Sequence, residues 1–246
     1  MASGDWLDLS EHACRAAQYD PSDTTGDLVQ AKAKINEAYL SVCHDGNPWD
    51  FLETEGQWTT TAGSDKYTYS SIATGMSVTG ASIREIMHIT NDTEGFMLRS
   101  MDWNAAETSS YSTQEAAEGQ GTPDSWSKWG AQGNATIRLY PNPDAVYTMG
   151  SYVYLTPAEM TANGDTPLIP LAWRHRVLVP YAAALLLEQE GGAEAASGYD
   201  RLMARYERNY QMMRTALATA KRPTFNVTAP DAFDHLPHSG GDWYYQ

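Results

Sequence analysis

The chain has 246 residues, of which 42% are hydrophobic and 11% aromatic, so it is long enough for one large domain or two small ones with a packed core. Its formal net charge of −15 argues against a general nucleic-acid binder that works by neutralising phosphates. The charge is uneven, because residues 1–170 carry −15, residues 171–222 carry +3 and residues 223–246 carry −3.

The first 48 residues predict two helices. Residues 7–19 place Leu9, Ala13 and Ala16 on one face, and residues 24–27 resemble a capping box before a second helix. Apolar residues at steps of three and four then form one stripe, and residues 46–48 (GNP) stop the helix; the stripe consists of Leu28, Ala31, Ile35, Tyr39 and Val42.

The cysteines and the N-terminus bear on the compartment in which the chain is made. Cys14 and Cys43 are the two cysteines, both fall in predicted helices, and neither has a metal-ligand neighbour at zinc spacing. We expect buried free thiols in a chain made in a reducing compartment. The acidic first residues do not predict a signal peptide, and no run of 18 apolar residues predicts a membrane span.

From residue 49 the pattern changes to short strands. Residues 57–61 and 66–69 predict a β-hairpin, residues 82–90 and 96–98 two further strands, and residues 102–111 a short surface helix with Asp102 as its N-cap. Residues 126–130 and 136–140 predict a second hairpin, and a strand over 146–155 follows the Pro141-Asn142-Pro143 corner. So many short strands predict a small antiparallel β-sandwich or barrel.

The C-terminal third returns to helical periodicity. Pro170 is expected to open a long helix, Pro180 to distort it near residues 176–179, and Gly191-Gly192 to end it. The last helix carries a seam at steps of three and four, which ends before Pro223; its members are Tyr199, Leu202, Tyr206, Tyr210, Met213, Leu217 and Ala220. Residues 223–246 lack periodicity and predict an extended arm.

Together these elements predict an α+β chain in which both chain ends build one helical bundle. The predicted bundle comprises residues 1–48 and 169–222, the inserted β module residues 49–168, and the extended C-terminal arm residues 223–246.

The sequence contains little that indicates catalysis. None of the six histidines makes an HxxxH or HExxH pair, and the GxSxG, P-loop and GxGxxG motifs are lacking, so we predict no catalytic, cofactor-binding or metal-binding residue. His235 and His238 lie three residues apart and can bind adventitious metal, although a solvated segment is the favoured interpretation.

Two other functions stay open. Acidic residues can pair as in a glycosidase, although a solvated acidic surface is favoured; the candidates are Glu53, Glu55, Glu85, Asp102 and Glu107. Tryptophans can stack on sugar rings, although in a small β module they more often fill the core; the candidates are Trp58, Trp103, Trp126, Trp129 and Trp173. A carbohydrate-binding β module and a glycosidase-type tail enzyme are therefore the alternatives.

The C-terminal residues suggest an interaction site. Trp243, Tyr244 and Tyr245 follow one another at a terminus without a core of its own, and Phe233 lies upstream. Such aromatics either fold back onto their own domain or act as anchors on a partner, since Trp and Tyr are strong interface anchors. We predict the anchor role for these four residues.

Several motifs occur in a recognisable order: residues 35–39 (INEAY), 49–52 (WDFL), 58–63 (WTTTAG), 67–69 (YTY), 83–86 (IREI), 121–123 (GTP), 137–144 (IRLYPNPD) and 165–170 (DTPLIP). With the two C-terminal helices, they resemble the head–tail adaptor (connector) proteins of tailed bacteriophages, the broad group that includes tail tubular protein A. The resemblance covers roughly residues 24–218, and the long 107–121 loop and the extended C-terminal arm depart from it.

The resemblance implies a structural protein of the virion neck, assembled in the host cytoplasm, with no enzyme activity and no cofactor. It implies a homo-oligomeric ring, usually of twelve copies, beneath the portal protein. The C-terminal segment would reach the portal, and the β module would meet the downstream tail component, which is a nozzle, stopper or tail terminator. DNA would pass through the lumen without specific binding and no membrane would be involved, and the negative charge of the chain agrees with a conduit in which DNA slides.

Overall fold

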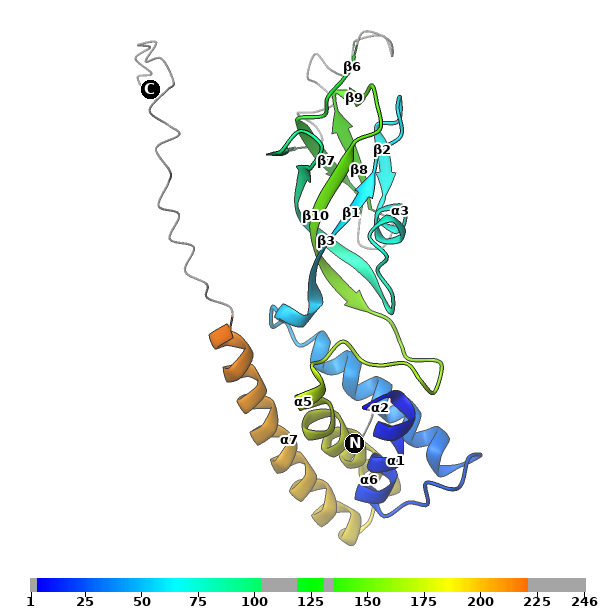
Figure 1. Cartoon of the computed structure of the whole chain (residues 1–246). Helices are drawn as coiled ribbons and strands as arrows, with labels where there is room; N and C mark the ends of the chain where they lie inside the picture. Colours follow the sequence, from blue (N-terminus) through cyan, green and yellow to red (C-terminus); the bar gives the residue numbers. More distant parts are fainter. Residues whose placement is uncertain (1–3, 103–118, 131–134, 221–246) are drawn as a thin grey trace.

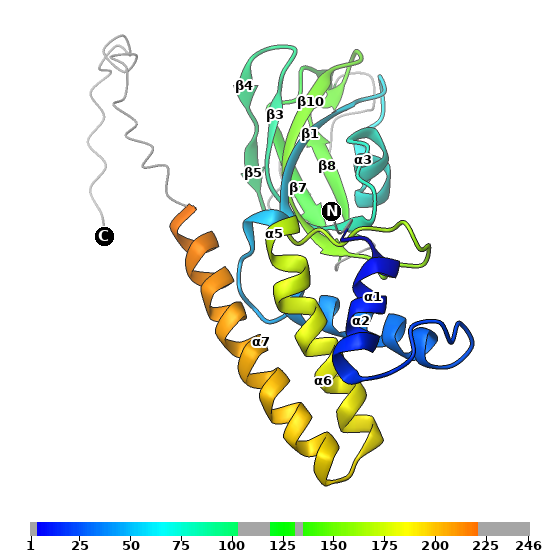
Figure 2. The same cartoon turned by 60° about the horizontal axis from the view of Figure 1, so that its bottom comes forward.

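The computed structural model describes residues 4–102, 119–130 and 135–220, which form a helical part and a β part (Figure 1). Helices from both chain ends pack together at one end of the molecule, and the strands between them in sequence form the other end (Figures 1 and 2). The predicted α+β arrangement is confirmed at this level. Within the described ranges, no helix combines the length and apolarity that crossing a membrane needs.

The helical part is built from α1 (Trp6–Ala17), α2 (Asp27–Cys43), α6 (Val179–Glu190) and α7 (Ala193–Ala220). Two hydrophobic cores hold them together, and each core takes residues from all four helices. The predicted stripe of α2 is buried, and the seam of α7 faces the other helices through Leu202, Tyr206, Tyr210 and Met213. The periodicity of three and four residues therefore identified the buried faces correctly.

The start of α2 differs from the predicted capping box. Gly26 is the N-cap and makes no side-chain hydrogen bond to the helix. Instead the Asp23 carboxylate accepts hydrogen bonds from the backbone N–H groups of Thr25 and Gly26, at 3.1 and 3.0 Å. A carboxylate at the positive end of a helix is favourable, and Asp23 was missed because it precedes the expected Ser/Thr position.

Both cysteines are buried in helices, as predicted: Cys14 in α1 and Cys43 in α2 are free thiols with 0% and 1% exposure. Burial raises the pKa of Cys14 to about 11 and also raises that of Cys43. Since the thiolate is the reactive form, we expect native protein to leave both thiols unlabelled by a disulfide reagent at pH 8. Denatured protein should release two equivalents; rapid labelling of the native protein would contradict the burial of both thiols.

Pro180 distorts the long helix where the sequence predicted it. After α5 (Leu171–Trp173), residues Arg174–Leu178 form a π-helical turn that leads into α6. Proline has no N–H, so the carbonyl four residues earlier, that of Arg176, loses its α-helical donor. Asn209 of α7 replaces that donor, with Nδ2 2.8 Å from the Arg176 carbonyl oxygen. The distortion is thereby tied to α7.

We expect Asn209→Ala to lower the free energy of unfolding by about 1 kcal/mol, because it removes this hydrogen bond. In a Pro180→Ala background the N–H of residue 180 is restored and can donate to the Arg176 carbonyl. The same Asn209 replacement should then lower the free energy of unfolding clearly less. Urea unfolding of the four proteins of this double-mutant cycle measures the difference. Equal costs in both backgrounds would show that Asn209 does not compensate for the proline.

The β part consists of two four-stranded sheets around one core, and one two-stranded pair. The first sheet has the order β1 (Glu53–Thr59), β10 (Thr148–Pro157), β3 (Ala81–Asn91) and β4 (Phe96–Met97). The second has the order β2 (Lys66–Thr68), β8 (Thr136–Tyr140), β7 (Ser125–Trp129) and β5 (Arg99–Met101). A third pair joins β6 (Gln120–Gly121) and β9 (Asn142–Pro143). Residues of both large sheets share one core, which gives a small sandwich.

The antiparallel prediction holds for most pairs but not for all. The predicted hairpin of residues 126–130 and 136–140 is confirmed, since β7 pairs antiparallel with β8. However, β5 pairs parallel with β7, and β6 pairs parallel with β9. These short parallel pairs connect strands distant in sequence, which a local pattern does not reveal.

The predicted hairpin of residues 57–61 and 66–69 is wrong. β1 pairs with β10, and β2 pairs with β8 in the other sheet. The connection is held by the Tyr67 hydroxyl, which accepts from the Thr61 N–H at 2.9 Å and donates to the Ser64 carbonyl at 2.8 Å. The turn residues were interpreted correctly, but the chain there crosses between sheets.

A short helix, α3 (Tyr69–Gly75), was not predicted, although Thr68 caps it by accepting from the Ser71 N–H at 3.1 Å. A 3-10 turn over Asp50–Leu52 precedes β1. The predicted helix over residues 102–111, apart from Asp102, and the residues next to Pro223, where the last helix was expected to end, lie outside the described residues. The boundaries of the β module at residues 49 and 168 stay a prediction; Leu168 packs against both the sandwich core and a helical core.

Candidate assembly surface

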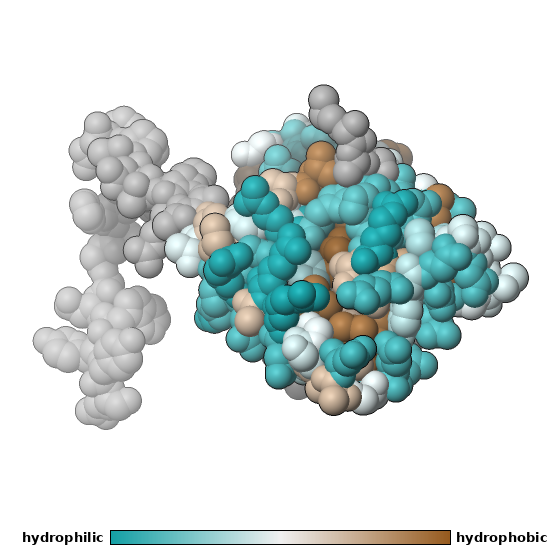
Figure 3. Space-filling view, turned by 90° about the horizontal axis from the view of Figure 1, so that it is seen from below, coloured by the Kyte–Doolittle hydropathy of each residue, from teal (hydrophilic) through white to brown (hydrophobic). Residues whose placement is uncertain are grey.

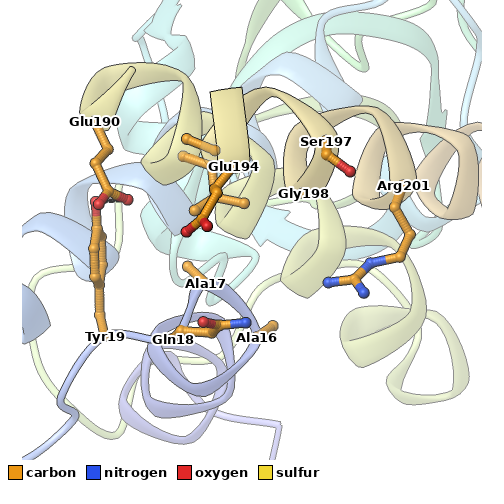
Figure 4. A pocket seen from close by; sticks show the side chains of 11 residues that line it. Ala16, Ala17, Gln18, Tyr19, Glu190, Glu194, Ser197, Gly198 and Arg201 are labelled. Atoms are coloured by element: carbon orange, nitrogen blue, oxygen red, sulfur yellow. Dashed lines mark hydrogen bonds between the residues drawn. The ribbon is translucent and has the colours of Figure 1, made fainter. Parts of the chain in front are cut away.

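A groove runs along the outside of the helical part, between the C-terminal end of α1 and the first half of α7. At one end it is a cavity of about 500 Å³ bordered by the α6–α7 turn (Figure 4); its lining includes Ala16, Gln18, Tyr19, Glu190, Glu194 and Arg201. A second hollow continues it along α7, and Arg201 and Ala16 line both. The two hollows therefore form one continuous surface feature.

The end of α1 is shaped by its C-cap. Gln18 has φ 67°, and the N–H groups of Gln18 and Tyr19 donate to the carbonyls of Arg15 and Cys14. The reversal places Tyr19 beside α6, where its hydroxyl donates to the Leu186 carbonyl at 3.4 Å and to Glu190 at 3.5 Å. Burial and the Glu190 carboxylate raise the pKa of Tyr19. Tyr19 thus joins the end of α1 to α6 and forms one end of the groove.

The charges of the groove change along its length. Glu190 and Glu194 lie at the α6–α7 turn, and Figure 4 shows Arg201 at the opposite side of the cavity. Arg205 and Arg208 follow Arg201 in the second hollow. Spacings of four and three residues put these three arginines on one face of α7, and all three are exposed. The chain as a whole carries −15, so this arginine face is opposite in sign to most of the molecule.

The helical end of the molecule has few large apolar side chains on its surface. Seen from below, it is mostly hydrophilic, with hydrophobic atoms visible in a central hollow (Figure 3). Among the described residues of the helical part, the large hydrophobic side chains that are exposed are Val29, Leu171 and Met212. These belong to three separate helices. An interface on this end would therefore be mainly polar.

The β part exposes more large hydrophobic side chains. Five described residues of this kind lie there: Met87, Phe96, Met97, Trp129 and Val146. Phe96 and Met97 form β4, one of the two edge strands of the first sheet. An exposed edge with apolar side chains is suited to a contact with another chain.

The structure weakens the two alternative functions. Trp58 and Trp126 are buried at 4% exposure, so the sugar-stacking candidates include core residues, as favoured from the sequence. Glu53 accepts a hydrogen bond from the Tyr152 hydroxyl, and Glu55 lines a pocket of about 590 Å³ with Gln57, His88 and Asp92. Trp103 and Glu107 lie outside the described residues. The strand register places Glu53 and Glu85 on either side of Tyr154 of β10, whereas Asp102 follows β5 of the other sheet.

The four predicted anchor residues, Phe233, Trp243, Tyr244 and Tyr245, all lie outside the described residues, so their role stays a prediction. The arginine face was missed from the sequence. The spacing of the arginines at positions 201, 205 and 208 is visible in the sequence. It marks an exposed face of α7 only once the structure shows that the opposite face is buried.

Comparison with known families decides the relationship. The family model of the SU10 adaptor protein matches residues 4–231, nearly the whole chain. The chain belongs to the SU10 adaptor protein family. The head–tail adaptor resemblance of the sequence motifs is confirmed at the level of this family, which is a family of phage structural proteins. A search of curated proteins found no match.

Membership of the SU10 adaptor family gives the groove and the arginine face a context. An adaptor works by binding other virion components, so extended surfaces matter more than a catalytic cleft. The family is structural, which favours the expectation that the chain is not an enzyme. The helical part and the β part then offer two chemically different surfaces, one polar and charged, the other with exposed apolar side chains.

Proposed function

We propose that this SU10 adaptor protein is a subunit of the ring that joins the portal to the tail in the virion neck. In this proposal about twelve copies assemble beneath the portal in the host cytoplasm, and the residues 223–246 arm docks on the portal through its aromatics. The β part meets the downstream tail component, and DNA passes through the lumen. The observation that carries the proposal is the family match across residues 4–231.

The charge distribution supports contacts between neighbouring copies through α7. The arginine face of one copy is complementary to the acidic surface that residues 1–170, at −15, give to the next. Because the exposed apolar side chains of the helical part are scattered, each such contact is weak by itself. We therefore propose that the free protein is monomeric and that the ring forms on the portal.

The β part supports the proposed downstream contact, and the overall charge supports the conduit. Its exposed apolar side chains, including the β4 edge, provide area that a tail component can bury. An acidic assembly repels the phosphate backbone, so the duplex can slide without being held.

Reconstitution tests the proposal. Purified chain is mixed with portal rings of the same phage and viewed by electron microscopy, and sedimentation measures the free chain. We expect a monomer that forms a ring layer only on the portal. Arg201→Glu, Arg205→Glu and Arg208→Glu together should prevent the layer while circular dichroism stays unchanged. Lys66→Glu, Arg99→Glu and Lys128→Glu together, three charge reversals at exposed positions of the β part, are the matched control.

Two results would contradict the proposal. A stable ring in dilute solution without the portal would refute portal-dependent assembly. Failure of the unaltered chain to bind the portal, together with immunogold labelling of virions away from the neck, would refute the adaptor role of this chain.

A further inference from the structure

Three ionisable side chains that are distant in sequence meet at the junction of α1 and the π-helical turn. Asp8 and His12 lie one turn apart on α1, and His175 comes from Arg174–Leu178. One ligand atom of each residue lies within 4.8 Å of those of the other two. The His12 and His175 rings are in edge-to-face contact, with centroids 4.9 Å apart.

The contact between Asp8 and His175 is unusual for a simple ion pair. His175 Nε2 lies 3.0 Å from Asp8 Oδ2. Nevertheless, Nε2 is shielded from solvent and has no partner in hydrogen-bond geometry. Two ligand atoms of one metal ion approach each other in this way: they are about 3 Å apart, and the imidazole lone pair points at the ion rather than at the carboxylate. A buried nitrogen without a partner otherwise carries a cost.

The Asp8 carboxylate is held in place by its surroundings. Its Oδ2 accepts the Gly4 N–H at 2.8 Å, while the Asp8 backbone N–H donates to the carboxylate of the N-cap Asp5 at 2.9 Å and so fixes the helix start that carries Asp8. Such outer contacts orient carboxylate ligands in metal sites. The side chains of Asp8 and His175 are 19% and 27% exposed, whereas that of His12 is 42% exposed. The site is therefore open on the His12 side.

His12 completes the set. Its Nδ1 lies 3.4 Å from Asp8 Oδ1 and 2.8 Å from the Asp8 carbonyl oxygen. A carbonyl oxygen only accepts, so Nδ1 carries the proton in this contact and Nε2 keeps the lone pair that a metal ion needs. The neighbouring arginines are engaged elsewhere: Arg174 donates to the carbonyls of Ile169 and Gly4, and Arg176 lies over the Trp173 ring. Their positive charges are thus directed to other partners.

We propose that Asp8, His12 and His175 form a site for one divalent transition-metal ion, with zinc as the best match. Two imidazole nitrogens and one carboxylate oxygen are suited to zinc, and water completes the coordination. The bound ion joins α1 to the π-helical turn and thereby stabilises the packing of the N-terminal helix. The inference does not depend on the proposed neck function.

The site was not predicted because the sequence shows no ligand pair of the usual kind. Asp8 and His12 have the i, i+4 spacing, but His175 is 163 positions from His12 in the chain. The π-helical turn before Pro180 sets which way residue 175 faces. Only the packing of α1 on this turn brings the third ligand to the other two.

The experiment uses the full chain with His235→Gln and His238→Gln, because those two histidines can bind metal by themselves. Chelator-treated protein is titrated with zinc chloride by calorimetry, and with cobalt(II) as a spectroscopic probe. We expect one ion per chain and a rise in Tm with zinc. His12→Gln and His175→Gln should each weaken zinc binding about tenfold or more, whereas His44→Gln, an exposed histidine at the end of α2, should leave it unchanged.

A second measurement leaves all three ligand residues unaltered, so it stays informative if the His12→Gln and His175→Gln variants fold poorly. Cobalt(II) added to the protein with intact His12 and His175 should broaden the NMR ring signals of these two residues before those of His44 and His88. The proposal is overturned if zinc does not bind one to one, if His12→Gln and His175→Gln bind as tightly as their parent, or if the broadening appears first elsewhere. Binding that survives both replacements would be adventitious.

Discussion

Replacing Trp49 by alanine is expected to lower the free energy of unfolding by about 3–5 kcal/mol, the range for removing a large buried aromatic. Trp49 is 2% exposed and lies where α2 leads into the β part. Its Nε1 donates to the Val42 carbonyl at 2.8 Å. Its ring stacks on Phe51 at 5.4 Å and meets the edge of Tyr210 of α7 at 5.9 Å. One side chain therefore connects α2, the entry to the sandwich and α7.

The control for Trp49→Ala is Trp129→Ala, because Trp129 is 59% exposed on β7 and its removal should cost less than about 1 kcal/mol. Trp49→Phe keeps an aromatic ring but loses the hydrogen bond, so an intermediate loss is expected. Denaturant unfolding should be followed by far-ultraviolet circular dichroism, since the variants change the tryptophan fluorescence itself. A cost for Trp49→Ala as small as that of Trp129→Ala would refute the connecting role of Trp49.

Removing residues 242–246 is expected to abolish docking on the portal and to leave a folded, soluble chain. Burial of one large aromatic contributes roughly 1.5–3 kcal/mol, and the deletion removes Trp243, Tyr244 and Tyr245. Ordering the backbone of the arm costs about 1–2 kcal/mol per residue, so the net binding free energy that the arm of one copy contributes is small. In a ring many copies bind the portal at the same time, so a small favourable binding free energy per copy gives tight binding of the whole ring.

Portal occupancy, counted by electron microscopy, measures this effect. A triple replacement of Trp243, Tyr244 and Tyr245 by serine should behave like the deletion, because it keeps the length of the arm. The matched control is His235→Gln with His238→Gln, which alters the same arm without its aromatics. Occupancy at the level of the unaltered chain after the deletion would mean that the aromatic residues are not the anchor.

Most helices of this adaptor could be predicted from the sequence because their signals are local. The stripes of α2 and α7 repeat every three to four residues, and one face of each is buried as expected. Pro180 lacks an N–H wherever it is placed, so a distortion near residues 176–179 follows from covalent structure, and the observed π-helical turn over Arg174–Leu178 overlaps this range. The antiparallel pairing of β7 with β8 likewise joins two strands that are close in sequence.

The pairing of the strands was decided only by the tertiary structure. Residues 57–69 satisfy the local pattern of a hairpin, but β1 and β2 are edge strands of two different sheets, and each pairs with a strand far away in the sequence, β10 or β8. Pairings between β1 and β10, or β5 and β7, depend on contacts far apart in the chain. Local periodicity identifies a strand and its inward face, whereas it does not identify the neighbour.

Some features of the candidate sites are visible in the sequence, and others exist only in the folded chain. The aromatic composition of the arm and the arginine spacing of α7 are properties of the sequence, and the proposed contacts with other chains start from them. The meeting of Asp8, His12 and His175, like the hydrogen bond from Asn209 to the Arg176 carbonyl, requires α1 and α7 to pack on one distorted helix. Sequence determined which side chains are present and which local faces they share; packing in three dimensions determined which of them meet, because contacts between distant segments depend on the whole fold.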